Sequence, residues 1–232
     1  MHNKSNKHFS YLSSDFNLNR RDQFSSIFYQ AREAIINPKI NSMLEFGIGR
    51  GSTLVLVKHF GVKHTGVDFN EELFKPDHVS TILNYEDNNK YDMVSAFQVL
   101  EHNPLFDLKD HLIKMKSLSN KYVFISVPYS GRWMSFNFNF NLFPSRFGRA
   151  SKSIVFTFPR LFFKKKRPIE EYLKREDKYN PHWWEIGDKG FSKKDFSILV
   201  NSIGLEINKS FHNEFFPYHL FYLLEIKPKK NE

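Results

Sequence analysis

The stretch MLEFGIGRG, residues 43–51, decides the fold, because an apolar run leads directly into three glycines at alternate positions. Glycine lacks a Cβ, so it adopts positive φ and lets a ligand approach the main chain closely. We expect Gly47, Gly49 and Gly51 to form the turn between a strand and the helix that follows it. Such a turn predicts a crevice shaped for a nucleotide.

The spacing of the glycines separates two kinds of cofactor. The dinucleotide fingerprint G-x-G-x-x-G would require a glycine at position 52, where this chain has Ser52, so NAD is disfavoured. The pattern acid-x-G-x-G-x-G, with Glu45 as the acid, instead resembles the first motif of class I S-adenosylmethionine-dependent methyltransferases. The resemblance implies that S-adenosylmethionine is the cofactor and that Glu45 helps to hold its amino-acid end. The loop residues that it places along the methionine part are Gly47, Ile48, Gly49 and Gly51.

Two further segments agree with this resemblance. Residues 52–60 are predicted as a helix and residues 64–68 as a second strand, whose final acid can accept hydrogen bonds from both ribose hydroxyls. Residues 91–97 are predicted as strand four, and residues 98–102 (QVLEH) resemble the "xxLEH" segment that follows this strand in many small-molecule methyltransferases. In that family the segment lines the sulfonium and adenine side of the cofactor. The residues thereby implied in cofactor binding are Asp68, Phe69, Phe97, Gln98 and Val99.

One position departs from the family pattern. The family often carries an acid at the end of strand three, which accepts from the adenine amino group, and the equivalent within residues 79–83 is Thr81. A threonine hydroxyl can accept a weaker hydrogen bond, and backbone groups of Ile82 and Leu83 could supply the rest. Asp87 is an alternative acid, although residues 84–89 are typical of a polar turn.

The remaining elements complete the predicted fold. Residues 122–127 form a continuous apolar run, as in a parallel strand buried on both faces. Ser192 and Asp195 form a capping box that opens a helix, and two strands at 205–211 and 218–226 follow it. The predicted class is α/β: a Rossmann-like, seven-stranded methyltransferase sheet with helices on both faces, the last strand antiparallel, and a cap inserted after strand five. We expect residues 22–128 and 182–232 to form this domain, residues 1–21 a flexible arm, and residues 129–181 an inserted lid.

Length and composition bound the function. A chain of 232 residues suits one α/β domain with an insertion. Without cysteine there is no disulfide framework or thiolate metal site, and the ten histidines show no three-ligand pattern, so we expect no metal. No N-terminal apolar region resembles a signal peptide, and no apolar run reaches the roughly 18 residues that span a bilayer. We expect a cytoplasmic protein, with contact at the inner face of the membrane as an option.

Residues 129–181 are unusual in charge and aromatic content. Twelve basic residues face four acidic ones there, which accounts for nearly all of the net charge of +9, and nine phenylalanines are interleaved. Phe136 to Leu142 alternates with period two, as a half-buried strand does, and an apolar run at 156–163 adjoins Lys164 to Arg167.

Three hypotheses compete for this insertion. It could be a cap with solvated charges, or a lid that selects an anionic acceptor through its arginines and lysines. It could also be a membrane-surface patch, in which residues 154–167 meet anionic lipid. Basic residues among aromatics also suit nucleic acid, but no RNP, KH, zinc-finger or helix-turn-helix pattern is visible, so we expect no such partner.

The catalytic candidates lie in two separate segments. His102, just after strand four, is the nearest candidate base for a hydroxyl acceptor. The stretch Pro181 to Ile186 resembles an "HxWEI" stretch of bacterial methyltransferases linked to glycan or lipid biosynthesis. There, His182 and Glu185 would share one face of a helical turn as a base and its orienting carboxylate. Structural roles for these residues, and weaker contributions from Tyr218 and His219, remain alternatives.

The function that these patterns predict is methyl transfer from S-adenosylmethionine to a small-molecule acceptor, with a hydroxyl on a sugar or a lipid-linked intermediate preferred. Two alternatives differ in class. One is a methyltransferase-fold subunit that binds a partner without catalysis, and the other is an RNA-directed methyltransferase that uses the basic insertion.

Overall fold

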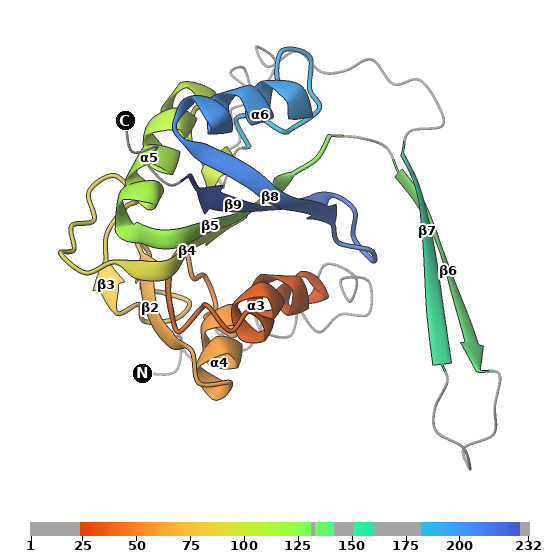
Figure 1. Ribbon diagram of the computed structural model, residues 1–232, viewed down its shortest axis with the longest axis horizontal. Coiled ribbons are helices and arrows are strands. Elements are labelled where there is room, and N and C mark those ends of the chain that lie inside the picture. Colours follow the sequence, from red (N-terminus) through yellow and green to blue (C-terminus); the bar gives the residue numbers. More distant parts are fainter. Residues whose placement is uncertain (1–23, 131–132, 142–150, 160–181, 228–232) are drawn as a thin grey trace, which may run out of the picture.

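A computed structural model describes residues 24–130, 133–141, 151–159 and 182–227. Its main feature is a seven-stranded sheet with the strand order β3-β2-β1-β4-β5-β9-β8 (Figure 1). The strands are β1 Ser42–Phe46, β2 Lys63–Asp68, β3 His78–Val79, β4 Tyr91–Phe97, β5 Ser119–Pro128, β8 Leu205–His212 and β9 His219–Ile226. Strand β9 is antiparallel to both β5 and β8, whereas the pairs from β3 to β5 are parallel. The predicted fold class is therefore confirmed.

The sheet is buried on both faces, which explains its apolar strands. Successive side chains of a strand point to opposite faces. Along β5, Val123, Ile125 and Val127 join one core cluster, while Tyr122 and Phe124 join the other. The central strands are thus mostly apolar, as expected for parallel strands covered by helices, although Glu45, Ser95 and Ser126 are also buried within them.

Helices cover each face of the sheet. Helices α3 (Ser26–Ile36) and α4 (Ser52–His59) lie on one side, and α5 (Leu108–Leu118) and α6 (Lys193–Ser202) lie on the other (Figure 1). Helix α6 begins with the predicted capping box of Ser192 and Asp195. Helix α5, absent from the sequence predictions, buries one stripe of side chains spaced three or four residues apart: Leu108, His111, Leu112, Met115 and Leu118.

The chain order places a crevice between β1 and β4. From β1 the chain proceeds to β2 and β3 on one side, and it then returns to β4, next to β1, before it continues outward to β5. At such a reversal the loops after neighbouring strands diverge and leave room for a ligand at their carboxyl ends.

Some boundaries differ from the sequence predictions. Strand β3 ends at Val79, so Thr81 lies in the turn that follows it rather than within a strand. The backbone N–H of Tyr129 donates to Tyr218 O, and that of Ser130 donates to Ile186 O, so the main domain extends two residues beyond Pro128. The predicted arm at residues 1–21 lies outside the described residues. Within the described part, no helix combines the length and apolar character needed to cross a membrane.

The insertion contributes a two-stranded antiparallel ribbon. Strand β6 (Trp133–Asn141) pairs with β7 (Ser151–Pro159), and the ribbon stands apart from the large sheet (Figure 1). Phe136 pairs across the ribbon with Phe156, and Phe138 with Ile154, so these side chains share one face. All four are more than two-fifths exposed, which differs from the half-buried strand predicted for the alternating phenylalanines.

A buried histidine joins α3 to β9. His219 Nδ1 lies 2.6 Å from Ser26 Oγ, and Ser26 Oγ accepts from the Asn213 side chain. Burial, together with a smaller effect from the nearby His182, lowers the pKa of His219 to about 4. The folded protein therefore keeps His219 neutral at pH values where the unfolded chain binds a proton.

We expect this site to make the free energy of unfolding decrease as the pH is lowered. Because the unfolded pKa is near 6.5, its contribution is intact above that pH and falls by about 3 kcal/mol as the pH approaches 4. Urea unfolding at several pH values measures the change. His219→Asn, which keeps a polar atom near the Nδ1 position but does not titrate, should be less stable at pH 7 and should lose less stability on acidification. Equal pH slopes for the two proteins would contradict this assignment.

Candidate functional site

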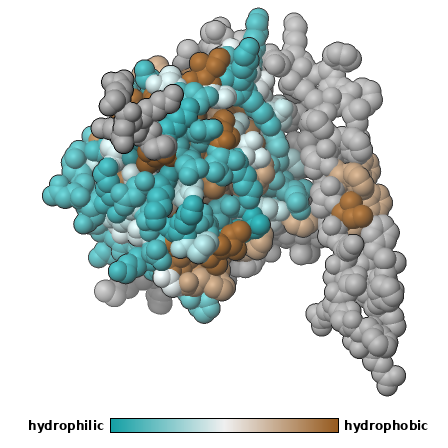
Figure 2. Space-filling model, viewed as in Figure 1, coloured by the Kyte–Doolittle hydropathy of each residue, from teal (hydrophilic) through white to brown (hydrophobic). Residues whose placement is uncertain are grey.

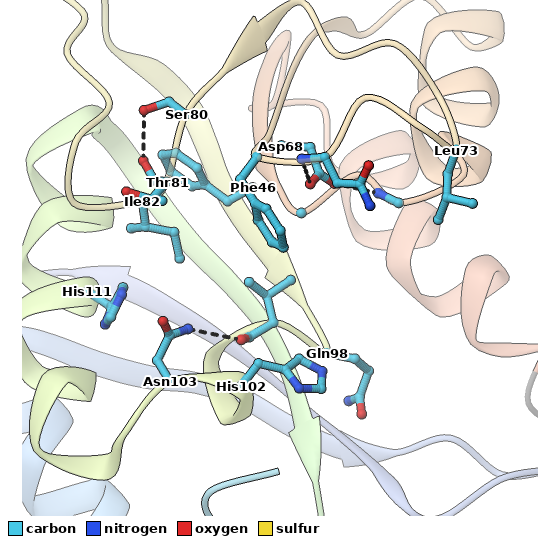
Figure 3. A pocket seen from close by; sticks show the side chains of 15 residues that line it. Phe46, Asp68, Leu73, Ser80, Thr81, Ile82, Gln98, His102, Asn103 and His111 are labelled. Atoms are coloured by element: carbon cyan, nitrogen blue, oxygen red, sulfur yellow. Dashed lines mark hydrogen bonds between the residues drawn. The ribbon is translucent and has the colours of Figure 1, made fainter. Parts of the chain in front are cut away.

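A cavity of about 570 Å³ opens at the carboxyl edge of the sheet, beside β1, β2 and β4 (Figure 3). This volume lies within the usual range for small-molecule sites. The cavity joins residues from five separate parts of the sequence: 46–49, 68–73, 80–82, 98–103 and position 111. The predicted site residues that line it are Gly47, Gly49, Asp68, Phe69, Ile82, Gln98, Val99 and His102.

The glycine loop presents bare backbone to this cavity. Gly47, Gly49 and Gly51 all have positive φ, of 71°, 51° and 69°. A Cβ on Gly47 would lie 2.3 Å from Val99 Cγ2, whereas one on Gly49 would meet no atom within 4 Å. Gly49 is therefore the point where a ligand can contact the main chain, and Gly47 is required for close packing of the loop against Val99.

Asp68 holds the glycine loop and also borders the cavity. Its Oδ2 accepts from the Gly49 N–H at 3.0 Å, and its Oδ1 accepts from the Asn70 N–H at 3.0 Å. An ionised carboxylate has about four lone-pair positions, so acceptor capacity remains on both oxygens. The side chain can thus bind two further donors, such as the hydroxyls of a ribose.

Glu45 does not line the cavity. Its Oε2 pairs with His64 Nε2 at 2.8 Å, and its side chain is almost fully buried. Burial raises the pKa of Glu45, and His64 partly offsets this. Because side chains alternate along β1, the neighbouring Phe46 borders the cavity and Glu45 points to the opposite face. The role predicted for Glu45 at the amino-acid end of the cofactor therefore has no support in its position.

Three other predicted residues lie behind the cavity wall. The Phe97 ring packs 5.1 Å from the Phe124 ring in the core, Ile48 lies next to Gly66, and Gly51 lies beneath Phe74. The alternative acid Asp87 accepts from the hydroxyls of two tyrosines, Tyr85 and Tyr91, and does not reach the cavity.

The far wall of the cavity comes from residues around β3. Ser80, Thr81 and Ile82 line it after the strand ends, and Asn70 and Leu73 line it from the preceding loop (Figure 3). Thr81 thus occupies the predicted place. The loop residues were missed because they show no periodic pattern or motif.

Gln98 connects the cavity to a second group of polar residues, which consists of Glu101, His102, His182, Glu185 and Tyr218. It has a φ of 56°, the one positive value at a non-glycine position in the described ranges, and such strain clusters at functional sites. With its amide oriented to match its neighbours, Gln98 donates to Glu101 Oε1 at 3.3 Å and accepts from Ser126 Oγ at 3.2 Å.

The predicted catalytic residues meet in this second group. The His102 and His182 rings lie 4.9 Å apart between centroids, and His182 Nδ1 lies 3.5 Å from Glu185 Oε1. Residues 182–185 form no helical turn, contrary to prediction. Two hydrogen bonds hold this segment instead: Trp183 N–H donates to Glu101 O at 2.8 Å, and Trp184 Nε1 donates to Asn103 O at 3.0 Å.

Tyr218 connects the two candidate residues of this segment. Its hydroxyl donates to Glu185 Oε1 at 2.6 Å and lies 3.1 Å from His182 Nδ1. Since the hydroxyl has one proton, which goes to Glu185, it can only accept from His182. Nδ1 therefore carries the proton of a neutral His182, and Nε2 keeps a free lone pair.

Glu101 is a member of this group that the sequence analysis quoted but did not assign to the site. It is fully buried, and its Oε2 has no hydrogen-bond partner among the residues that the structure describes. Burial, together with a smaller effect from the negative charge of Glu185, raises the pKa of Glu101 to about 8. Its position directly before His102 was the available signal.

Comparison with known proteins identifies the class of this chain. A methyltransferase domain family matches residues 17–185, and the chain belongs to this family. No curated protein sequence gives a significant match. The chain is thus an enzyme of the methyltransferase class, with the Rossmann-like fold described above.

Solved structures with this fold share little sequence with the chain. A methyltransferase from Clostridium acetobutylicum, described as S-adenosylmethionine-dependent, has 13% identity and a TM-score of 0.55, and the match covers 97% of this chain and 100% of that one. Magnesium protoporphyrin IX methyltransferase from Synechocystis, solved with bound S-adenosylmethionine, has 13% identity, a TM-score of 0.52 and coverage of 98% of each chain. A sugar N-methyltransferase from Streptoalloteichus has 11% identity and a TM-score of 0.54, with 92% and 93% covered. At these identities the likeness establishes the fold, of which S-adenosylmethionine is the cofactor.

Proposed function

We propose that this protein binds S-adenosylmethionine in the cavity beside β1, β2 and β4 and transfers its methyl group to a small-molecule acceptor. The observation that carries the proposal is the position of Gly49 and Asp68, which together present bare backbone and a carboxylate to one cavity. The family membership and the bound cofactor of the Synechocystis relative support it.

Each part of the cofactor would lie against a different part of the cavity lining. The ribose would lie at Asp68, and the adenine would lie between Phe69 and the turn at Thr81 and Ile82. The methionine part would follow Gly47 and Gly49, which directs the sulfonium toward Gln98 and Val99. Transfer of an already electrophilic methyl needs mainly alignment, which can lower a barrier by about 7 to 11 kcal/mol.

The acceptor would then meet the polar group at the other side of the cavity. Figure 3 shows His102 and Gln98 lying across the cavity from Asp68 and Thr81. A hydroxyl acceptor must lose its proton, and His182 has a free Nε2 lone pair because Tyr218 and Glu185 hold its Nδ1. We therefore assign acceptor activation to His102, His182 and Glu185.

For the acceptor itself we propose a hydroxyl on a sugar or lipid-linked intermediate, of anionic character. The Streptoalloteichus relative is a sugar N-methyltransferase, and the insertion begins after the carboxyl end of β5, at the edge of the sheet where the cavity opens. The ribbon favours membrane contact through residues 154–167, because Ile154 and Phe156 are exposed; Figure 2 shows apolar colours on this ribbon. Residues 160–167 lie outside the described part.

Sedimentation of the protein with phosphatidylserine vesicles should be lost in Phe156→Asp. Unchanged sedimentation of this variant would contradict the proposed membrane contact.

Binding and transfer test the function separately. We expect S-adenosylhomocysteine to bind the wild type and His182→Ala equally in isothermal titration, because the histidine lies outside the proposed cofactor contacts. Incubation of cell extract with isotopically labelled S-adenosylmethionine should label a small molecule with the wild type, and about 10²- to 10⁴-fold more slowly with His182→Ala. A folded wild type that does not bind S-adenosylhomocysteine would defeat the proposal.

A further inference from the structure

We propose that Glu101, His102 and His182 form a binding site for a divalent transition-metal ion at the side of the cavity. One carboxylate oxygen and one nitrogen from each ring lie within 4.8 Å of one another. Ligands of one ion lie about 2.0–2.2 Å from it, so they are separated by roughly 3 to 4 Å. Side-chain shifts of less than about 1 Å would therefore complete the set.

The cluster is held in place before any ion binds. Glu101 and His102 belong to the short 3-10 helix η2 (Leu100–His102), and His182 comes from the segment after the insertion. The bond from the Trp183 N–H to Glu101 O joins these two segments directly next to the proposed ligands. The Trp184 side chain, which is fully buried, fastens the same segment to Asn103. The main chains that carry the ligands are therefore fixed relative to each other.

Glu101 gives an independent reason to expect a cation. Its side chain is fully buried, Oε2 has no partner, and no lysine or arginine contact to it is present in the described residues. Apart from the Gln98 amide at Oε1, nothing offsets the burial of this carboxylate, and burial favours its neutral form unless a cation lies next to it. Both imidazoles belong to the same cluster, with His102 Nε2 3.9 Å from Glu101 Oε1, and an ion shared by all three groups would supply the positive charge that keeps this carboxylate ionised.

The protonation of His182 also suits a metal ligand. In the neutral ring, Nδ1–H donates to Tyr218, whose hydroxyl donates to Glu185, and this tautomer leaves Nε2 available as a ligand. Ligating histidines characteristically donate their other ring N–H to an oxygen that fixes the ring orientation. Tyr218 and Glu185 provide this support, and Glu185 adds a negative charge near the cation.

Two imidazoles and one carboxylate favour a particular group of ions. Imidazole suits zinc, iron, cobalt and similar ions, and three protein ligands leave coordination positions open for water or a substrate. Hard ions such as Ca²⁺ prefer six or more oxygen ligands, which the cluster does not offer. His102 lines the cavity, so an open position can face the acceptor.

An ion at this place would activate an acceptor hydroxyl, a role that rests on the proposed function. The ion would lower the pKa of an acceptor hydroxyl bound to it, so that the hydroxyl loses its proton to water more readily. Its lone pair then forms a bond to the methyl carbon, and the sulfur–carbon bond breaks with its electron pair remaining on sulfur. The sulfonium becomes a neutral thioether, so charge and atoms balance without a further reactant.

Cobalt(II) tests the site directly, because its visible absorption reports its ligands. Protein freed of metal with a chelator should bind one Co²⁺ per chain with saturable visible absorption. His182→Ala and Glu101→Gln should bind at least about 10²-fold more weakly, and Tyr218→Phe, which removes only the support of His182, about 10- to 10²-fold more weakly. His59→Ala, at an exposed histidine on α4, should bind as the wild type does. Circular dichroism confirms that each variant is folded.

The outcomes separate the metal site from the cofactor site. Absence of saturable Co²⁺ binding, or equal binding by the wild type and His182→Ala, would overturn the metal site. If S-adenosylhomocysteine still binds in that case, the proposed function stands and His182 acts as a base. If Co²⁺ binds at the cluster while S-adenosylhomocysteine does not bind, the metal site is supported and the proposed function fails.

Discussion

Gly49→Arg is expected to fold and to lose all measurable binding of S-adenosylhomocysteine. Gly49 borders the cavity, and no atom lies within 4 Å of the place where its Cβ would be. An arginine side chain there would enter the cavity without disturbing the core. Isothermal titration measures the binding, and thermal unfolding shows that the variant remains folded.

Gly61→Arg is the matched control for this substitution. Gly61 also has positive φ, 85°, and open space at its Cβ, but it lies beyond the end of α4 and away from the cavity. A non-glycine residue in this backbone region costs about 1 to 2 kcal/mol, so both variants should lose similar stability. Cofactor binding should persist in Gly61→Arg alone. Normal binding by Gly49→Arg would place the ligand elsewhere.

Asp68→Ala is expected to weaken S-adenosylhomocysteine binding by roughly 10²- to 10⁴-fold. Each hydrogen bond from a ribose hydroxyl to the carboxylate contributes about 1.5 to 3 kcal/mol, and about 1.4 kcal/mol corresponds to a factor of ten. The substitution also removes the acceptor of the Gly49 N–H, which loosens the glycine loop. Both effects reduce affinity.

A 2′-deoxy analogue of the ligand separates these two effects. The wild type should bind the analogue more weakly than S-adenosylhomocysteine, whereas Asp68→Ala should bind both alike, because the carboxylate that distinguishes them is gone. Asp92→Ala is the control: Asp92 also accepts backbone N–H groups, at Asn41 and Ser42, but it lies at the amino end of β4. An unchanged preference for the ribose hydroxyl in Asp68→Ala would show that the ribose lies elsewhere.

Much of the fold could be predicted because it depends on local patterns. Apolar runs marked the parallel strands, the capping box marked α6, and the two final strands gave the antiparallel end of the sheet. Helix α5 was missed although its buried residues have helical spacing and Asp107 stands at its N-cap position, so this pattern was available in the sequence. The length of β3 was overestimated because residues 79–83 are apolar enough to resemble a strand.

The cofactor site was predictable in part for a related reason. The stereochemistry of glycine identified Gly47 and Gly49, and the position of an acid at the end of a strand identified Asp68. Glu45 shows the limit of this reasoning. A motif gives its place in the sequence, but strand alternation and the contact with His64 decide which way its side chain points.

The sequence by itself determined the class of fold and the glycine turn after β1, because periodicity and backbone preference are properties of neighbouring residues. Only the tertiary structure decided that His102 and His182, eighty residues apart, meet beside Glu101 and share the support of Tyr218. Contacts of this kind arise from packing: the buried Trp184 and the backbone bond from Trp183 to Glu101 fix the two segments against each other, and no local pattern encodes that distance.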